Sequence, residues 1–271
     1  MGADIKKLRN RIKSVDSTLH LTTAMGLVAS SKIRRAMEAM NRGRDYEAAV
    51  RGAIEPLINS PECRRSPYMR GETGGGVDCL VVIAGDRGMA GGYNANVFRL
   101  LREYSEANCI PVGKRACDRL GGEVCYAESF DYGKALGLAI ELCRGFAEGR
   151  YDRVGVLGTH YHSMLSQEAQ VRWILPLCAD PSQTGTHVAS AIFEPDEQTV
   201  LDAAVPEYVA GVLLSAVRES FACEIAARRT AMDSAGKNAQ EMIDGLRLEY
   251  NRARQSAITQ EITEIVAGSG S

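Results

Sequence analysis

A ladder of apolar and small residues in the first forty positions constrains the fold of this chain more than any other feature. The ladder advances in alternate steps of three and four residues, through Ile5, Leu8, Ile12, Val15, Leu19, Thr22, Gly26, Ala29, Ile33, Ala36 and Met40. No proline interrupts these steps, so the pattern predicts one long helix with a narrow apolar seam, as in a coiled coil. Small residues in the middle of the seam, Thr22 to Ala29, allow a partner helix to approach closely.

The C-terminal part of the chain carries a similar stripe. The stripe runs through Met232, Ala235, Ala239, Met242 and Leu246 and continues, after a slip, through Tyr250, Ala253 and Ala257. The simplest partner for each terminal helix is the other one. A helix of about fifty residues would be roughly 75 Å long at 1.5 Å per residue, so we expect the pair to protrude as a rod.

An apolar ladder also occupies the extreme C-terminus, where most chains fray. It consists of Ile258, Ile262, Ile265 and Val266, and Gly-Ser-Gly-Ser follows it and ends the helix. This ladder requires burial. Its partner is either the chain's own domain or another protein, and the sequence pattern leaves both open.

The hydrophobic period changes between the two helical stretches. The run DCLVVIAGD at 78–86 is typical of a buried parallel strand, and a glycine-rich turn and a helical pattern from Asn94 follow it. Further strands are expected at 109–113, 123–127 and 153–162, an edge strand or extended arm at 171–177, and a helix at 134–149. Strands that alternate with helices predict an α/β fold class for this inserted segment.

The predicted organisation therefore has five parts. They are an N-terminal coiled-coil helix at 1–58, a linker at 59–76, an α/β domain at 77–190, a second linker at 191–206 and a C-terminal coiled-coil helix at 207–271.

Composition excludes several classes of protein. The chain has 271 residues and 45% hydrophobic content, and it contains no run of eighteen uncharged apolar residues that would span a membrane. The basic N-terminus lacks the continuous apolar core of a signal peptide. The first fifty residues hold ten Lys or Arg against five Asp or Glu, a balance that suits nucleic acid or an acidic protein surface.

The eight cysteines are scattered, and no Cys-x-x-Cys pair occurs among them. This spacing predicts reduced thiols in a cytosolic protein.

Signals for catalysis are weak. The turn GDRGMAGGYN at 85–94 fits neither the Gly-x-Gly-x-x-Gly pattern nor a P-loop, so a structural turn is expected here instead of a nucleotide site. His160 and His162 would share one face of a strand, but no carboxylate or thiolate cluster matches them as metal ligands. No nucleophile elbow is present. We expect no catalytic residue, no cofactor and no metal.

Four stretches carry a resemblance to a known family. LTTAMGLVASSKIRRA at 21–36, GDRGMAGGYN at 85–94, AMDSAGKNAQEMIDGL at 231–246 and NRARQSAITQEITEIVAG at 251–268 resemble, in order, signature stretches of the gamma subunits of F-type ATP synthases. The resemblance implies an antiparallel coiled coil of the terminal helices with an inserted Rossmann-like α/β domain. It also implies a non-catalytic rotor shaft that couples ion flow to ATP synthesis or hydrolysis.

The resemblance further implies three groups of contact residues. A polar group that would contact the catalytic beta subunits comprises Arg254, Gln255, Thr259 and Glu261. A second group that would face an acidic lever of beta comprises Met25, Lys32, Arg34 and Arg35. An apolar bearing at the top of the alpha-beta hexamer would comprise Ile258, Ile262, Ile265 and Val266.

The implied partners are three alpha subunits, three beta subunits, an epsilon subunit and the membrane c-ring, at the cytoplasmic face of a bacterial membrane. Some positions depart from the family pattern: Thr23 stands where Lys is usual, Gly26 replaces a long side chain, and Gly85 replaces Ser or Thr. A divergent or second-copy rotary ATPase subunit is therefore an alternative, as is a coiled-coil adaptor protein.

Overall fold

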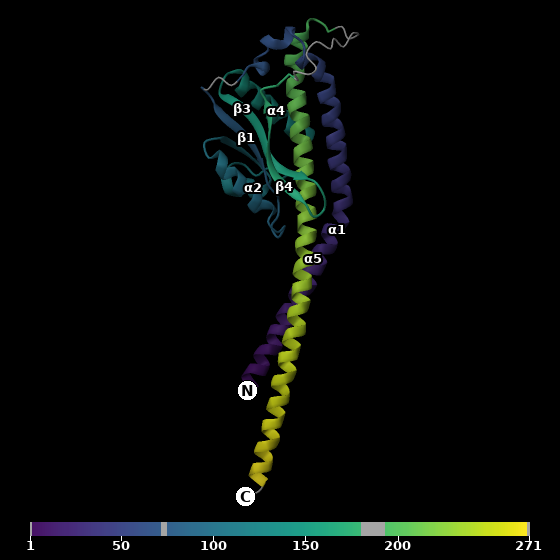
Figure 1. The fold of residues 1–271 in the computed structure, drawn as a ribbon, viewed down its shortest axis with the longest axis vertical. Helices are drawn as coiled ribbons and strands as arrows, with labels where there is room; N and C mark the ends of the chain where they lie inside the picture. The colour runs from purple at the N-terminus through teal and green to yellow at the C-terminus, as the bar shows by residue number, and fades with distance from the viewer. Residues whose placement is uncertain (1, 72–74, 180–192, 270–271) are drawn as a thin grey trace. The chain divides into compact units, whose positions relative to one another are not determined.

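The computed structural model describes residues 2–71, 75–179 and 193–269, and the chain divides into two compact units. Met1–Ser31 and Arg228–Ser271 form one unit, which we call the helical unit. Lys32–Ala227 forms the other, which we call the α/β unit. Two long helices, α1 (Gly2–Ile58) and α5 (Glu197–Ser269), contribute residues to both units (Figure 1).

The α/β unit is built on a four-stranded sheet with the order β2-β1-β3-β4. Its strands are β1 (Val77–Ile83), β2 (Asn108–Val112), β3 (Tyr151–Tyr161) and β4 (Gln167–Leu175). β1 pairs in parallel with β2 and β3, whereas β4 is an antiparallel edge strand on β3. Of the two alternatives expected at 171–177, the edge strand is confirmed over the extended arm, and the strand begins earlier, at Gln167. Pro176, which has no N–H to donate, follows its last residue.

The two faces of β1 contact different helices, because successive side chains of a strand point to opposite sides. Cys79, Val81 and Ile83 lie in one core with α4 (Tyr132–Ala147) and the adjoining parts of α1 and α5. Leu80 and Val82 lie in a second core with α2 (Tyr93–Leu101) and α3 (Lys114–Leu120). Helices on both faces of a mostly parallel sheet make a Rossmann-like unit (Figure 1).

The strand expected at Glu123 to Ala127 is wrong. No strand is present there, and the short helix α3 before it was not anticipated. The backbone N–H groups of Ala127 and Glu128 donate to the carboxylate of Asp86, at 2.8 and 2.9 Å. A side chain from another loop thus takes the place of a neighbouring strand.

Helix α5 begins at Glu197, earlier than the predicted start at residue 207. The helix contains Pro206, the last residue of the predicted linker, and proline removes one helical hydrogen bond. Asp196 caps the helix by accepting the N–H of Thr199 at 2.8 Å, and Leu201 and Val205 are fully buried before the proline. Capping and burial together keep the helix continuous. Residues 180–192 lie outside the described residues, and they include only the first two positions of the linker predicted at 191–206.

Helix α5 also contains a stretch with a mean hydropathy of 1.6, which is apolar and long enough to cross a membrane by composition alone. More than half of that stretch, 56%, is buried inside the structure, as expected for the core helix of a folded domain. This stretch is not free of charged residues, so the sequence criterion of eighteen uncharged apolar residues did not identify it.

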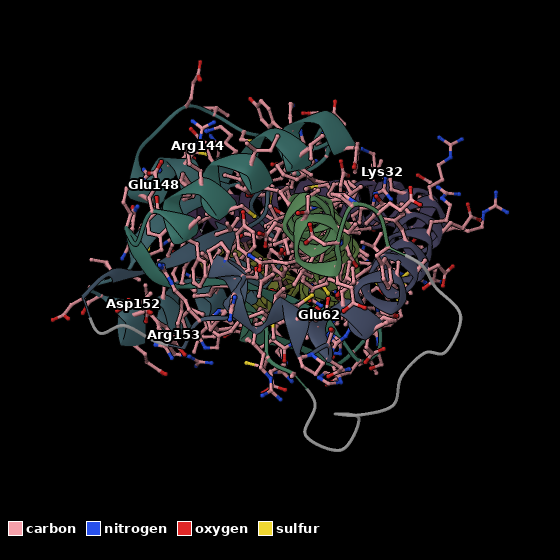
Figure 2. All side chains as sticks on the ribbon, turned by 90° about the horizontal axis from the view of Figure 1, so that it is seen from above. Lys32, Glu62, Arg144, Glu148, Asp152 and Arg153 are labelled. Carbon is pink, nitrogen blue, oxygen red and sulfur yellow. The ribbon has the colours of Figure 1, made fainter. Side chains whose placement is uncertain are left out.

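The predicted linker at 59–76 contains two short 3-10 helices, Glu62–Arg65 and Pro67–Met69. Cys63 and Tyr68 from these helices are buried in the core of the α/β unit. Figure 2 shows Arg144, Glu148, Asp152 and Arg153 at the outside of this unit. Arg144 and Glu148 are exposed there, whereas Arg153 pairs with Asp78 at 2.6 Å.

In the helical unit the two helices run antiparallel. A Cβ atom on Gly26 would lie 3.6 Å from the Cβ of Met232, and one on Gly236 would lie 3.9 Å from Cδ1 of Leu19. Residues later in α1 therefore meet residues earlier in α5. The small seam residues permit this close approach.

One position in the predicted α5 stripe is wrong. Met242 is 52% exposed, and Ile243, at 1%, takes its place beside buried Ala239 and Leu246. With Ile243 in the seam, the steps from Ala239 are four, three and four residues, so the slip after Leu246 disappears. A strict seven-residue repeat explains the choice, since it keeps one face toward the partner helix.

Candidate functional site

The C-terminal isoleucine ladder is exposed in the structure. Ile258, Ile262 and Ile265 are 46%, 56% and 70% exposed, and Val266 is 64% exposed. The self-packed alternative is therefore wrong for the described residues. Apolar side chains that repeat along one helix at this exposure mark a surface for another protein.

Polar residues precede and interleave with the ladder. Arg254, Gln255 and Thr259 are all exposed, and the Thr259 hydroxyl donates to the Gln255 carbonyl at 2.9 Å within the helix. The guanidinium of Arg254 and the side-chain amide of Gln255 project into solvent, where their N–H groups can donate hydrogen bonds to a partner protein. The side chain of Glu261, predicted to act with them, lies outside the described part of the structure.

A second exposed apolar surface lies on α1 within the helical unit. Leu21, Leu27 and Val28 are 59%, 67% and 54% exposed, and Met25, the predicted contact, is half-buried. The sequence prediction missed these three residues. Their signal was available, because they are large apolar side chains that fall off the seam positions of an otherwise polar helix.

The predicted basic residues of α1 differ in their contacts. Lys32 Nζ lies 2.8 Å from Oε1 of Glu128 in the α/β unit, whereas Arg34 pairs with Glu38 along its own helix, at 3.7 Å. Arg35 is exposed. The Lys32 side chain remains 41% exposed in its pair, so it is reachable by solvent.

The glycine-rich turn between β1 and α2 holds a protein carboxylate. Glu224 of α5 accepts the backbone N–H of Asp86 and that of Arg87, each at 3.1 Å. Such N–H groups are the donors with which glycine-rich turns bind phosphate. Because Glu224 occupies these N–H groups, the turn is better explained as a structural element than as a nucleotide-binding site.

The Asp86 side chain completes the turn. Its carboxylate is 7% exposed and accepts the N–H groups of Lys114, Ala127 and Glu128. Neither Asp86 nor Glu224 was singled out from the sequence. A lone carboxylate in a turn or on a helix has no sequence pattern that distinguishes a buried acceptor from a solvated charge.

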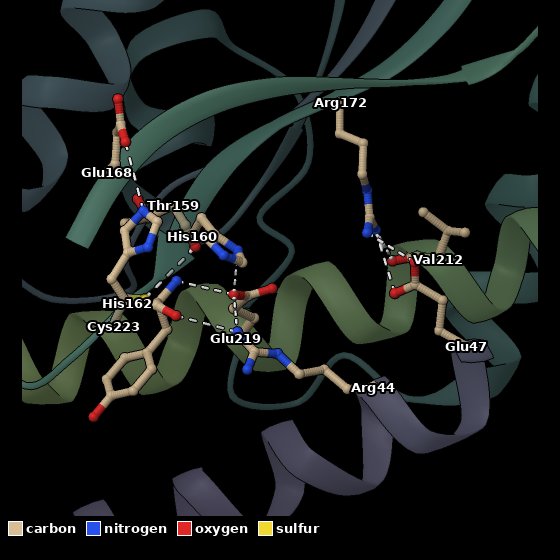
Figure 3. Close-up of polar contacts among 11 residues, drawn as sticks. Arg44, Glu47, Thr159, His160, His162, Glu168, Arg172, Val212, Glu219 and Cys223 are labelled. Carbon is tan, nitrogen blue, oxygen red and sulfur yellow. Dashed lines mark hydrogen bonds and ion pairs between the residues drawn. The ribbon is translucent and has the colours of Figure 1, made fainter. Parts of the chain in front are cut away.

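His160 and His162 lie on the same face of β3, as predicted, with ring centroids 4.8 Å apart. Nδ1 of His160 lies 2.7 Å from Oε1 of Glu219, which also accepts from Arg44 at 2.6 Å (Figure 3). Nε2 of His162 lies 3.5 Å from Glu168. The two rings thus have separate carboxylate partners, and no group of three or more metal-ligating side chains occurs among the described residues.

A cavity of about 430 Å³ lies beside this cluster, between β3, β4, α1 and α5. Arg172 from β4 crosses it to pair with Glu47 of α1 at 2.7 Å (Figure 3). Carboxylates of both helices therefore hold the sheet in place. Four of the charged residues that line the cavity, Arg44, Glu47, Arg172 and Glu219, are used in these internal pairs.

All eight cysteines are free, and most are buried. Burial raises the pKa of Cys79 and that of Cys143 to about 12. Cys178, in contrast, is exposed. The thiolate is the reactive form, so the buried thiols are poor nucleophiles.

We expect iodoacetamide at pH 8 to alkylate Cys178 in the native protein and to leave Cys79 and Cys143 unmodified. A pKa three units above the ordinary value lowers the thiolate fraction about a thousandfold, and burial adds a steric barrier. Mass spectrometry after denaturation and a second label would measure this. Labelling of Cys79 at the rate of Cys178 would contradict the expectation.

Comparison with known proteins gives consistent results. A family model described as ATP synthase matches residues 4–271. The ATP synthase gamma chain of Ruminococcus albus is 38% identical, with 98% of each chain covered. The sodium ion specific ATP synthase gamma chain of Acetobacterium woodii is 35% identical, with 99% of this chain and 98% of the relative covered.

Solved structures share the fold. The rotor of the Euglena gracilis mitochondrial ATP synthase matches with a TM-score of 0.66 at 17% identity, covering 95% of this chain and all of that one. A chain of the Tetrahymena thermophila mitochondrial ATP synthase central stalk and c-ring matches with a TM-score of 0.61 at 22% identity, covering 79% and 99%. At these identities the likeness concerns the fold alone.

Proposed function

The chain belongs to the ATP synthase gamma-chain family, and we propose that it is the central, non-catalytic shaft of an F-type ATP synthase. In this role it couples rotation of a membrane ring to ATP synthesis or hydrolysis at an alpha-beta hexamer. The observation that carries the proposal is the exposed isoleucine ladder, which follows a buried coiled-coil seam along the same helix.

The tip of α5 suits a bearing. Contacts between apolar surfaces have little directionality, so a helix with Ile258, Ile262 and Ile265 on its surface can turn inside an apolar sleeve at low cost. Directed hydrogen bonds at the same level would hold the shaft at one angle. We therefore assign the isoleucine ladder to the bearing, where the shaft must rotate with little resistance.

The polar residues next to the ladder suit an angle-dependent contact. Arg254, Gln255 and Thr259, with Glu261, would form oriented hydrogen bonds with one catalytic beta subunit at a time. On α1, Met25 with the basic residues Lys32, Arg34 and Arg35 would face an acidic lever of beta. Charge complementarity favours encounter and orientation there without requiring a fixed fit.

Coupling follows from asymmetry. Three equivalent beta subunits around one asymmetric shaft meet different contacts at any moment, so each has a different affinity for nucleotide. Rotation exchanges these contacts in turn. In the reverse direction, ATP hydrolysis drives rotation of the shaft. Each nucleotide state of the beta subunits favours one rotor angle, so a change of nucleotide shifts the population of rotor angles.

The other expected partners are an epsilon subunit and the c-ring, both through the α/β unit. The complex would lie at the cytoplasmic face of a bacterial membrane, with this chain as a peripheral component. The relatives support the bacterial assignment, since they include gamma chains of Ruminococcus albus and Acetobacterium woodii.

Co-expression with alpha and beta subunits tests the proposal, with the full chain compared with a chain truncated after Tyr250. The full chain should purify with three alpha and three beta subunits and support ATP hydrolysis. The truncated chain should lower turnover or assembly at least tenfold, because it lacks both the polar residues and the ladder. A chain ending at Gly268 is the matched control and should behave as the full one.

Two results would contradict the shaft role. One is a folded full chain that associates with no alpha-beta hexamer, which would favour an adaptor function. The other is full turnover by the chain truncated after Tyr250.

A further inference from the structure

The glycine-rich turn after β1 is joined to α5 by a buried carboxylate. Glu224 is 1% exposed, and its two oxygens accept the N–H groups of Asp86 and Arg87. Hydrogen bonds to an ionised group are stronger than those between neutral groups. The donors are backbone groups, which cannot rotate away as side chains can.

Gly85 makes room for this joint. A Cβ atom at Gly85 would lie 2.8 Å from Cδ of Glu224 and 3.0 Å from its Oε2. Glu224 cannot move aside freely, because both of its oxygens are engaged. The glycine, where the gamma-chain pattern has Ser or Thr, and the glutamate therefore form a complementary pair.

Further contacts connect the turn to its surroundings. Asp86 holds the N-terminus of α3 and the loop at Ala127, through its buried carboxylate. Glu128, next to that loop, pairs with Lys32 of α1 at 2.8 Å and with Arg87 at 3.6 Å. Both long helices are thus tied to one turn.

These ties lie at the two chain ends of the α/β unit. Lys32 is its first residue, and Glu224 lies in the last turn of helix before Ala227, its final residue. The apolar contacts of α5 in this unit, such as those of Leu213 and Val217, resist separation of the helix from the sheet. Glu219 of the same helix adds ion pairs with His160 and Arg44. Directed hydrogen bonds at Glu224 resist rotation of the helix.

We propose that Glu224 is a positioning residue that transmits torque between the α/β unit and helix α5, with Gly85 as its steric complement. The inference rests on the proposed shaft function. Under torque, the two bonds from the turn hold α5 at one rotational angle against the sheet. Without them the helix twists further before the same torque is delivered.

The test uses complete ATP synthase reconstituted in vesicles, with Glu224→Ala and Glu224→Gln in this chain. We measure ATP hydrolysis and ATP-driven ion pumping against an imposed gradient, and the angular fluctuations of the rotor in single complexes. Glu224→Ala should keep hydrolysis within about twofold, lower pumping per ATP at least threefold and widen the fluctuations. Glu224→Gln, which keeps one acceptor, should fall between it and the parent chain.

Two further variants separate torque transmission from general destabilisation. Leu142→Ala removes a fully buried side chain of α4 away from the turn, and it should lower stability without changing pumping per ATP. Gly85→Ala should change pumping per ATP and the rotor fluctuations as Glu224→Ala does. The glutamate is still present in this variant, but the added methyl group displaces its carboxylate from the turn. In the double variant Gly85→Ala with Glu224→Ala, the two effects should not add.

The inference is overturned if Glu224→Ala pumps and fluctuates as the parent complex does, or if Leu142→Ala lowers pumping per ATP equally. Additive effects of Gly85→Ala and Glu224→Ala would also overturn it. Failure of the shaft function itself is recognised separately, because the parent chain would then not assemble with the hexamer at all.

Discussion

Replacement of Ile258, Ile262 and Ile265 by glutamine is expected to weaken assembly with the alpha-beta hexamer about a hundredfold while leaving the isolated chain unchanged. These side chains are 46% to 70% exposed in the chain alone, so they contribute little to its own stability. Burial of the remaining surface in a sleeve would supply about 1 kcal/mol each, or about 3 kcal/mol together. Glutamine is at least as good a helix former as isoleucine, so α5 should persist.

The matched control replaces the same three isoleucines by leucine. Leucine keeps the apolar area, and a smooth sleeve does not require one side-chain shape, so the affinity should stay within about twofold. Titration of the hexamer with labelled chain measures the affinity, and circular dichroism follows the helix. Equal affinity of the glutamine variant and the parent chain would rule out an apolar bearing.

Replacement of Gly113 by alanine is expected to destabilise the α/β unit by about 3–5 kcal/mol, a large part of the stability of a typical domain. Gly113 has φ of +92°, and a Cβ atom there would lie 1.9 Å from the carbonyl oxygen of Ala84. Both atoms are backbone or rigidly attached to it, so the strand end and the start of α3 must separate. Thermal unfolding should shift downward by on the order of 10 °C.

Gly121 provides the control for this second variant. It also has positive φ, +86°, but apart from its chain neighbours no described residue has a heavy atom within 4 Å of a Cβ atom built there. Gly121→Ala should therefore cost only the backbone strain, about 1–3 kcal/mol. If the two alanine variants unfold at the same temperature, the close approach at Ala84 does not determine the stability.

Several features of the fold were predictable because they depend on local periodicity. The α1 seam follows from a repeat of 3.5 residues, the buried β1 strand from a continuous apolar run, and the edge position of β4 from one proline. The strand expected at Glu123 to Ala127 and the late start of α5 were wrong. In both cases a contact distant in sequence, to Asp86 or to the core, overrode the local signal.

The candidate site divides in the same way. The isoleucine ladder stood out because apolar residues at a chain end need a partner, and its exposure in the structure leaves that partner outside the chain. Leu21 and Val28 were not predicted as contact residues because they lie outside the seam positions of α1. Ile243 replaced Met242 because the partner helix selects one face, a choice that neighbouring residues in the sequence do not make.

By itself, the sequence determined the long helices, the α/β class of the inserted segment and the absence of a phosphate-binding pattern in the turn at 85–94, since each depends on residue type and spacing over short distances. Only the tertiary structure decided what fills that turn. Glu224 is 138 residues from Asp86 and contacts it because the fold brings α5 under the end of β1. A contact between residues this far apart leaves no local pattern in the sequence. Closing so long a loop costs chain entropy, so the two residues pair only when the core has placed the helix beside the sheet.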